Sequence, residues 1–198
     1  MPDANLLEED LFHRESNLDK RLIKSFDDLD ILLSKLREKG KKIVLTQGVW
    51  DLIHEGHALY LEAAKRQGDV LIVGVDSDRL TKIRKGPKRP IVPETERLRM
   101  LAHLRSVDFL FVRDNNEDMD DLVRAVLPDV MVISKSTKDF KTSVDGLYQF
   151  SKKVVCLEPQ ATTSTTARIR NLTIEGAEKL AEEISKLTKD FLDKIKNS

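Results

Sequence analysis

The stretch KKIVLTQGVWDLIHEGHALYLEAAKRQGDVLIVGV, residues 41–75, holds two apolar runs separated by a glycine loop and a helical pattern. The runs at 41–47 and 69–75 are continuously apolar, which is typical of strands buried on both faces of a parallel sheet. Residues 57–67 have helical spacing, and Gly68 is expected to end that helix as a C-cap. The stretch therefore predicts a strand–helix–strand unit with a right-handed crossover.

The same alternation continues along the chain. Apolar runs at 107–112, 129–134 and 152–158 predict three more strands. Helical patterns lie at 94–104, 117–126 and 141–151. The sequence thus predicts an α/β fold, a Rossmann-like, doubly wound, five-stranded parallel sheet.

Two amphipathic segments flank this unit. Residues 26–39 and 174–195 both repeat apolar residues at three- and four-residue spacing, which predicts a helix in each. Packing on the chain's own domain is the favoured interpretation of both, with a subunit interface as the alternative. The expected organisation is an N-terminal helical extension at 1–40, an α/β domain at 41–172 and a C-terminal amphipathic helix at 173–198.

Composition narrows the class of protein. The 198 residues include 34 Lys and Arg and 34 Asp and Glu, so a dedicated nucleic-acid binder, which usually carries excess positive charge, is not expected. The single cysteine, Cys156, excludes an internal disulfide and a cysteine-rich zinc site. The acidic N-terminus does not resemble a secretory signal, and no apolar window has membrane-spanning length. We expect a cytoplasmic protein with no membrane partner.

The pair His54 and His57 admits three interpretations. Their i, i+3 spacing differs from the i, i+4 pair of zinc protease helices, so a metal site is not favoured. They also sit where a helix begins after a strand, next to Gly48, and free amides at such an edge bind phosphate. Taken alone, the spacing suits phosphate binding and two ordinary loop residues equally.

Two further elements favour phosphate. Ser164, Thr165 and Thr166 follow the last expected strand and open another helix, where a single N-cap needs only one hydroxyl. A basic cluster also follows the second expected strand, although a solvated loop remains the alternative for each of its members: Arg79, Lys82, Arg84, Lys85, Lys88 and Arg89, with Arg97 beyond.

These motifs carry a family resemblance. TQGVWDLIHEGH resembles the first-strand motif of the cytidylyltransferase-like nucleotidyltransferases, and TSTTARI resembles their closing Ser-Thr-Thr motif. KGPKRPIVPETERLRMLAHLRSVDFLFV is similar to the heptose-phosphate adenylyltransferases and less so to glycerol-phosphate cytidylyltransferase. The resemblance covers roughly residues 41–172. It implies transfer of AMP, or alternatively CMP, from a nucleoside triphosphate to a phosphorylated sugar or polyol.

The resemblance also implies residue roles. His54, His57 and Arg84 would act on the phosphates as catalytic residues. Mg²⁺ would arrive with ATP or CTP rather than on a metal site of the protein, and a homodimer would form near RSVDFLFV. The nucleotide would be bound by Gly48, Val49, Trp50, Asp51, Gly56, Arg97, Ser164, Thr165 and Thr166, with Asp51 bracing the loop.

The segment that follows the fourth strand departs from the family pattern. VISKSTKDF stands where heptose-phosphate adenylyltransferases resemble one another in Lys-Gly-Gly-Asp-Tyr. Lys135 and Lys138 are the expected acceptor-binding cations there, with a solvated loop as the alternative. A flavin or alcohol-phosphate acceptor, and a catalytically silent nucleotide-binding module, therefore stay open as rival functions.

Overall fold

The computed structural model describes residues 16–115, 120–135, 149–158, 172–173 and 176–186. The chain forms two compact units, residues 1–162 and 163–198, and each is described by itself. The helices of the first unit are α2 (Leu18–Arg21), α3 (Phe26–Glu38), α4 (Glu55–Lys65), α5 (Asp78–Lys85), α6 (Glu94–Ala102) and α7 (Asp121–Val126). Its strands are β1 (Leu22–Ile23), β2 (Ile43–Gly48), β3 (Val70–Asp76), β4 (Phe109–Arg113), β5 (Val130–Ser134) and β6 (Lys153–Leu157).

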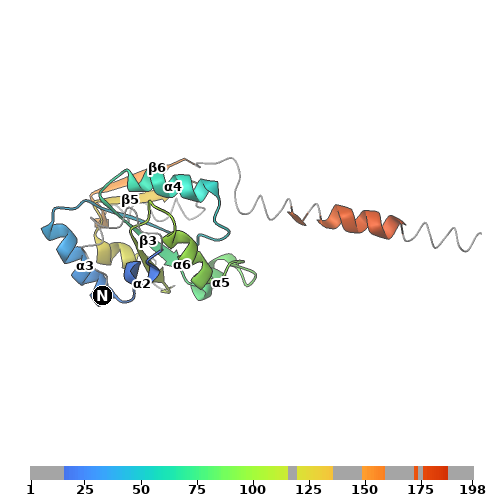
Figure 1. Ribbon diagram of the computed structural model, residues 1–198, viewed down its shortest axis with the longest axis horizontal. Coiled ribbons are helices and arrows are strands. Elements are labelled where there is room, and N and C mark those ends of the chain that lie inside the picture. The colour runs from blue at the N-terminus through green and yellow to red at the C-terminus, as the bar shows by residue number, and fades with distance from the viewer. Residues whose placement is uncertain (1–15, 116–119, 136–148, 159–171, 174–175, 187–198) are drawn as a thin grey trace, which may run out of the picture. The chain divides into compact units, whose positions relative to one another are not determined.

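All strands pair in parallel, in the order β1-β4-β3-β2-β5-β6. Figure 1 labels β3, β5 and β6 of this sheet and the helices α2 to α6. The predicted α/β, Rossmann-like, doubly wound sheet is confirmed. The predicted strand count of five is too low, because the described residues contain a sixth, two-residue strand. Leu22 and Ile23 pair with Leu110 and Phe111 and so cover the outer edge of β4.

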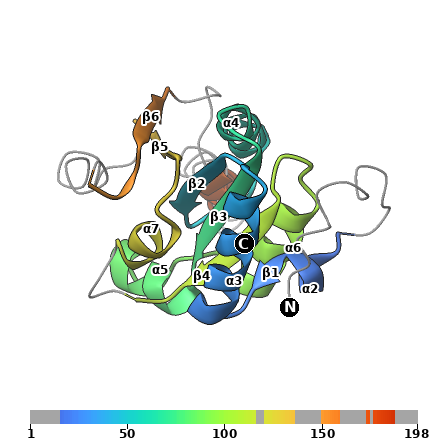
Figure 2. The same cartoon turned by 90° about the vertical axis from the view of Figure 1, so that its left-hand side faces the viewer.

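Helices cover both faces of the sheet (Figure 2). On one face, α3 and α7 pack on Ile43 and Leu45 of β2 and on Ile72 of β3. On the other face, α4 and α6 pack on the alternate residues Val44 and Leu71. Because neighbouring residues of a strand point to opposite faces, the continuous apolar runs bury both faces of the sheet.

The first flanking segment belongs to this core. Ser25 caps α3 by accepting a hydrogen bond from the Asp28 amide at 3.1 Å. Leu29, Leu32, Leu33 and Leu36 are buried against the sheet, at the spacing that predicted the helix. The segment 26–38 therefore packs on the same hydrophobic core as β2, β3 and β4.

The helices differ from the predictions in two places, one missed helix and one helix that begins later than predicted. Helix α5 was not predicted, because five of its eight residues, DRLTKIRK, are charged and only Leu80 and Thr81 are buried. The helix predicted at 117–126 is described only as α7, which begins at Asp121. Most of the helix predicted at 141–151 lies outside the described residues.

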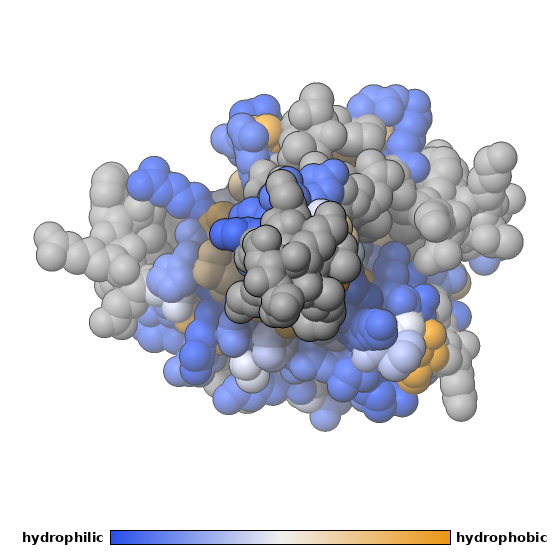
Figure 3. Space-filling view, turned by 90° about the vertical axis from the view of Figure 1, so that its right-hand side faces the viewer, coloured by the Kyte–Doolittle hydropathy of each residue, from blue (hydrophilic) through white to orange (hydrophobic). Residues whose placement is uncertain are grey.

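In the second unit, residues 176–186 are helical. No helix among the described residues is both long enough and apolar enough to cross a membrane. Figure 3 shows one face on which the coloured surface is mostly hydrophilic, with small separate apolar patches.

Candidate active site

The direction of the chain connections reverses at β2. The chain passes from β2 to β3 through α4 on one face of the sheet, and it reaches β5, the other neighbour of β2, through α7 on the opposite face. In open parallel sheets, such a reversal leaves a crevice outside the carboxyl ends of the two strands. The loop that contains His54 and His57 leaves β2 at this edge.

His54 and His57 form a reciprocal cap at the start of α4. Nδ1 of His54 accepts a hydrogen bond from the Gly56 amide at 3.0 Å, and Nδ1 of His57 accepts one from the His54 amide at 3.4 Å. The two rings lie 4.2 Å apart between centroids. A nitrogen that accepts a hydrogen bond carries no proton, so in each ring the proton lies on Nε2.

Burial keeps His57 uncharged. Its pKa falls from 6.5 to about 4, because burial disfavours the charged ring and His54 repels it, while Asp51 opposes the shift. At pH 7 His57 is therefore a neutral Nε2–H donor at the positive end of a helix. A phosphate oxygen can accept such a hydrogen bond.

Trp50 anchors the loop to strand β3. Its ring is buried, and Nε1 donates to the Gly74 carbonyl at 3.0 Å. The backbone of Trp50 has φ 57°, and a Cβ on Gly48 would meet the indole at 3.4 Å. A side chain at position 48 would thus be in ordinary van der Waals contact with the ring, and the close approach of a ligand to Gly48 stays a prediction.

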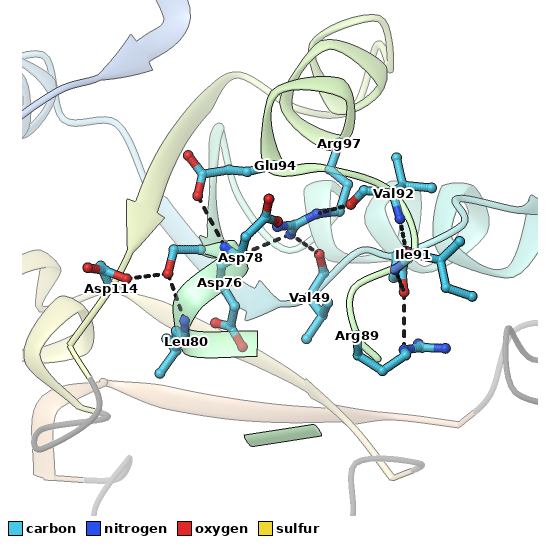
Figure 4. Close-up of polar contacts among 12 residues, drawn as sticks. Val49, Asp76, Asp78, Leu80, Arg89, Ile91, Val92, Glu94, Arg97 and Asp114 are labelled. Carbon is cyan, nitrogen blue, oxygen red and sulfur yellow. Dashed lines mark hydrogen bonds and ion pairs between the residues drawn. The ribbon is translucent and has the colours of Figure 1, made fainter. Parts of the chain in front are cut away.

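Asp51 joins two loops. Its buried carboxylate accepts hydrogen bonds from the amides of Ile91 and Val92, both at 2.9 Å. Arg89 Nε lies 3.2 Å from the same carboxylate. Figure 4 shows Arg89, Ile91 and Val92 beside Val49 of the first loop. The sequence prediction that Asp51 braces the loop corresponds to this clamp.

Arg97 lies at the centre of these contacts and has no exposed surface. Its guanidinium donates to the Val49 carbonyl at 2.5 Å, the Asp76 carbonyl at 2.8 Å and the Val92 carbonyl at 3.0 Å (Figure 4). It also donates to the Asp78 carboxylate at 2.7 Å. Arg97, expected to bind the nucleotide, thus connects the loops that follow β2 and β3 with the segment before α6.

Arg84 comes from α5, and its side chain is 20% exposed. Its Nη1 donates to the carboxylate of Asp76 at 2.5 Å, at the carboxyl end of β3. The structure thus places this predicted catalytic residue at the carboxyl edge of the sheet, the edge from which the histidine loop also leaves.

The expected acceptor-binding and closing motifs are described only in part. Lys135 follows β5 and forms an ion pair with Glu158, which follows β6 and raises the pKa of the lysine. Both side chains are more than half exposed. Lys138 and the run Ser164, Thr165 and Thr166 lie outside the described residues.

Sequence reasoning missed several polar residues of this edge, among them Tyr60, Asp76, Asp78 and Arg113. The Tyr60 hydroxyl contacts Thr46 Oγ1 at 2.9 Å and donates to the Val132 carbonyl at 3.1 Å, which links α4 to β2 and β5. Burial raises the pKa of Tyr60, so it stays protonated. The position of Asp76 at a predicted strand end was the available signal, whereas Tyr60 resembled any aromatic residue of an amphipathic helix.

No group of three or more His, Cys, Asp or Glu side chains that could hold a metal ion gathers within the described part of the chain. The donor set of the histidine loop consists of N–H groups, which bind oxygen anions rather than cations. The histidine N–H groups suit phosphate oxygens, and the binding of Mg²⁺ with the nucleotide stays a prediction.

Comparisons with known proteins agree with this geometry. The profile of the family described as Cytidylyltransferase-like matches residues 45–186. Bifunctional protein HldE of Desulfatibacillum aliphaticivorans is 37% identical over 147 residues, which are 74% of this chain and 30% of that protein. Bifunctional protein HldE of Helicobacter pylori strain G27 is 40% identical over 144 residues, 73% of this chain and 30% of that protein. This chain therefore spans about a third of the length of the curated relatives it matches.

Two crystal structures share the fold. The lipopolysaccharide core biosynthesis protein from Thermoplasma volcanium GSS1 has a TM-score of 0.51 and 30% identity, over 60% of this chain and 97% of that one. Pantoate-beta-alanine ligase from Francisella tularensis has a TM-score of 0.57 over 81% of this chain and 77% of that one. Its 16% identity makes that similarity one of fold alone.

Proposed function

This chain belongs to the cytidylyltransferase-like family and is a nucleotidyltransferase, and from that premise we propose its reaction. It transfers a nucleoside monophosphate, AMP by preference and CMP as the alternative, from a nucleoside triphosphate to a phosphorylated sugar or polyol. Pyrophosphate is the second product. The sugar or polyol acceptor rests on the motif KGPKRPIVPETERLRMLAHLRSVDFLFV, which is similar to the heptose-phosphate adenylyltransferases.

The histidine cap is the observation that carries the proposal. His54 and His57 each use Nδ1 to accept a backbone hydrogen bond, which places the proton of each ring on Nε2 at the N-terminus of α4. Neutral donors at a helix N-terminus suit the triphosphate, because they stabilise its developing negative charge without any proton transfer.

The chemistry needs no general base. An oxygen of the acceptor's phosphate is already anionic and attacks the α-phosphorus of the nucleotide, forming a new P–O bond. The bond from the α-phosphorus to the bridging oxygen breaks, and its electron pair leaves on pyrophosphate. The protein must therefore position the two phosphates and stabilise charge on the leaving group.

Other residues shape the pocket. The backbone would contact the nucleotide at Gly48, Val49 and Gly56. The Trp50 ring holds this loop through its hydrogen bond to the Gly74 carbonyl of β3. Because Asp51 and Arg97 are buried, we assign them the task of holding the loops together rather than contact with the phosphates. Ser164, Thr165 and Thr166 remain the proposed phosphate ligands of the closing motif.

Acceptor binding by Lys135 and Lys138 also remains a proposal. Lys135 already pairs with Glu158, so an anionic acceptor would have to replace that carboxylate. If these lysines bind the acceptor, then Lys135→Ala combined with Lys138→Ala raises the KM for the acceptor and leaves nucleotide affinity unchanged. An unchanged acceptor KM would remove both residues from the site.

Mg²⁺ would enter with the nucleotide and neutralise charge on the triphosphate. We further propose a cytoplasmic homodimer. The apolar side chains Val107, Phe109, Leu110 and Phe111 of RSVDFLFV are buried within the protomer, so a two-fold contact there would have to use its exposed residues, such as Arg105. Light scattering at micromolar concentration that shows only a monomer would exclude the dimer.

A substrate matrix tests the proposed reaction. The four nucleoside triphosphates are each combined with Mg²⁺ and with phosphorylated sugars, phosphorylated polyols, a flavin mononucleotide and an alcohol phosphate, and pyrophosphate release is measured. The proposal predicts release with ATP, or failing that CTP, and only when a phosphorylated sugar or polyol is present. Nucleotide binding without release in any combination would favour a silent nucleotide-binding module.

A further inference from the structure

Three arginines from different elements converge on Asp76, the last residue of β3. Arg97 of α6 donates to its backbone carbonyl at 2.8 Å. Arg84 of α5 and Arg113 of β4 donate to the two oxygens of its carboxylate, at 2.5 Å and 2.7 Å. Figure 4 shows the Asp76 carboxylate directed away from Arg97. Asp76 thus contacts Arg97, which also binds the loop after β2, through its backbone carbonyl. It contacts Arg84 through its side chain.

The sheet itself builds the pair between Asp76 and Arg113. Strand register places the two residues opposite each other at the carboxyl ends of β3 and β4. Gly74, two residues earlier, leaves space for the arginine, since a Cβ there would lie 2.9 Å from Arg113 Cδ. Asp76 has no exposed surface and Arg113 is 3% exposed. Burial lowers the pKa of Arg113, and Asp76 opposes that shift.

Arg84 differs from Arg113 in its access to solvent. Its side chain is 20% exposed, whereas the carboxylate that holds it is buried. The hydrogen bond from Arg84 Nη1 to this carboxylate restricts the direction of the planar guanidinium, a group whose geometry suits phosphate oxygens.

We propose that Asp76 is a positioning residue, which fixes the Arg84 guanidinium toward the triphosphate while Arg113 holds the Asp76 carboxylate in place. The inference rests on the proposed function, because it requires Arg84 to contact phosphate. It assigns Asp76 no contact with substrate. Its effect on the ligand therefore passes entirely through Arg84.

A double-mutant cycle in nucleotide binding tests this dependence. Affinity for Mg²⁺–ATP and Mg²⁺–CTP is measured by calorimetry without acceptor, and the tighter nucleotide is used for Arg84→Ala, Asp76→Asn and their combination. We expect each single change to weaken binding about tenfold or more, the loss typical of one charged hydrogen bond. We expect the combination to bind no more weakly than Arg84→Ala alone. Losses that multiply would overturn the proposal.

Asp76→Asn leaves the buried Arg113 without its carboxylate, and the variant could fail to fold. The variant Asp76→Asn with Arg113→Met removes the uncompensated charge. Its melting temperature should recover toward the wild-type value while nucleotide affinity stays reduced. If affinity recovers together with the melting temperature, Asp76 only stabilises the fold and the proposal is wrong.

Asp129→Asn is the matched control. Asp129 also pairs with a cation, Lys152 at 2.6 Å, and accepts a backbone hydrogen bond from Ile43 at 2.8 Å, but it precedes β5 at the opposite edge of the sheet. Nucleotide affinity should be unchanged in this variant. If His57→Ala weakens binding while Arg84→Ala does not, the positioning role falls and the proposed function stands. If the wild type binds neither nucleotide, the proposed function itself falls.

Discussion

At the residue scale, His57 illustrates how burial adapts a common side chain to bind an anion. A charged imidazolium would attract phosphate more strongly, but the ring is largely desolvated and adjacent to a second histidine. The structure therefore keeps a neutral ring whose Nδ1 is occupied by the His54 amide and whose Nε2–H is the donor. The tautomer of His57 is thus set by a backbone hydrogen bond, which the spacing of the histidines in the sequence does not predict.

The lowered pKa of His57 makes folding stability depend on pH. Between its ordinary pKa of 6.5 and the folded value of about 4, the unfolded chain binds a proton that the folded chain does not. The contribution of His57 to the free energy of unfolding is therefore fully present above about pH 6.5 and is lost as the pH falls toward about 4. In urea unfolding between about pH 7 and pH 4.5, the wild type should lose on the order of 2 kcal/mol more than His57→Asn. Equal losses would show that His57 is not desolvated.

The two histidines should also matter for the reaction itself. His54→Ala and His57→Ala should each slow turnover by about 10²–10³-fold, the effect of removing one preorganised donor. Both are loop or helix-terminal residues, so circular dichroism at neutral pH should show an intact fold. Full activity in either variant, once an acceptor is known, would remove that histidine from the phosphate site.

At the scale of elements, the segment 89–92 depends on Asp51 for its position. Asp51→Asn retains a single acceptor oxygen for the two amides of Ile91 and Val92 and loses the charge that faces Arg89. If the local opening free energy falls by about 1.4 kcal/mol, trypsin should cleave after Lys85 or Lys88 about tenfold faster.

Asp69→Asn controls for the loss of a carboxylate that accepts a backbone amide. Asp69 accepts a hydrogen bond from the Lys42 amide at 2.7 Å, at the amino edge of the sheet. Cleavage after Lys85 and Lys88 should be unchanged in this variant. Unchanged cleavage in Asp51→Asn as well would mean that the clamp does not hold the segment.

Strand β3 contains a closely packed glycine, Gly74. A Cβ at Gly74 would lie 2.8 Å from Leu122 Cδ2 and 3.0 Å from Gln47 Cβ. Gly74→Ala should therefore lower the free energy of unfolding by about 1–3 kcal/mol in urea denaturation, as overpacking does. Gly176→Ala, where a Cβ meets nothing within 4 Å, should not destabilise the protein. An equal effect of the two substitutions would contradict the packing around β3.

The elements differ in how well sequence could predict them. The five predicted strands are confirmed. Four of them, β2 to β5, consist mostly of buried apolar residues, whereas β6 is only partly buried and was predicted from its apolar composition alone. Strand β1 has two residues, too few to show any periodicity. It forms by hydrogen bonding to the outer edge of β4. Helix α5 is stabilised by Ser77, which caps it by accepting from the Leu80 amide at 2.9 Å, rather than by an apolar face.

At the scale of the whole molecule, the sequence predicted the sheet edge at which the histidine loop lies better than it predicted the contacts of the buried arginines. Gly48, His54 and His57 could be placed at the carboxyl edge because the strand–helix order alone decides that edge. The destination of Arg97 could not be predicted, since one charged residue of an amphipathic helix can equally reach solvent, phosphate or backbone carbonyls. The convergence of Arg84 and Arg113 on Asp76 also required the register of β3 against β4.

The central claim is that the protein transfers the α-phosphoryl group of a nucleoside triphosphate together with its nucleoside. The most direct measurement follows radioactive phosphorus in ATP, or in CTP if CTP is the nucleotide used, in the presence of Mg²⁺ and the phosphorylated acceptor that supports pyrophosphate release. Label at the α-position should move into a product that contains the acceptor, while label at the γ-position should leave entirely as pyrophosphate. Transfer of the γ-label to the acceptor would contradict the account and identify a phosphoryl transferase instead.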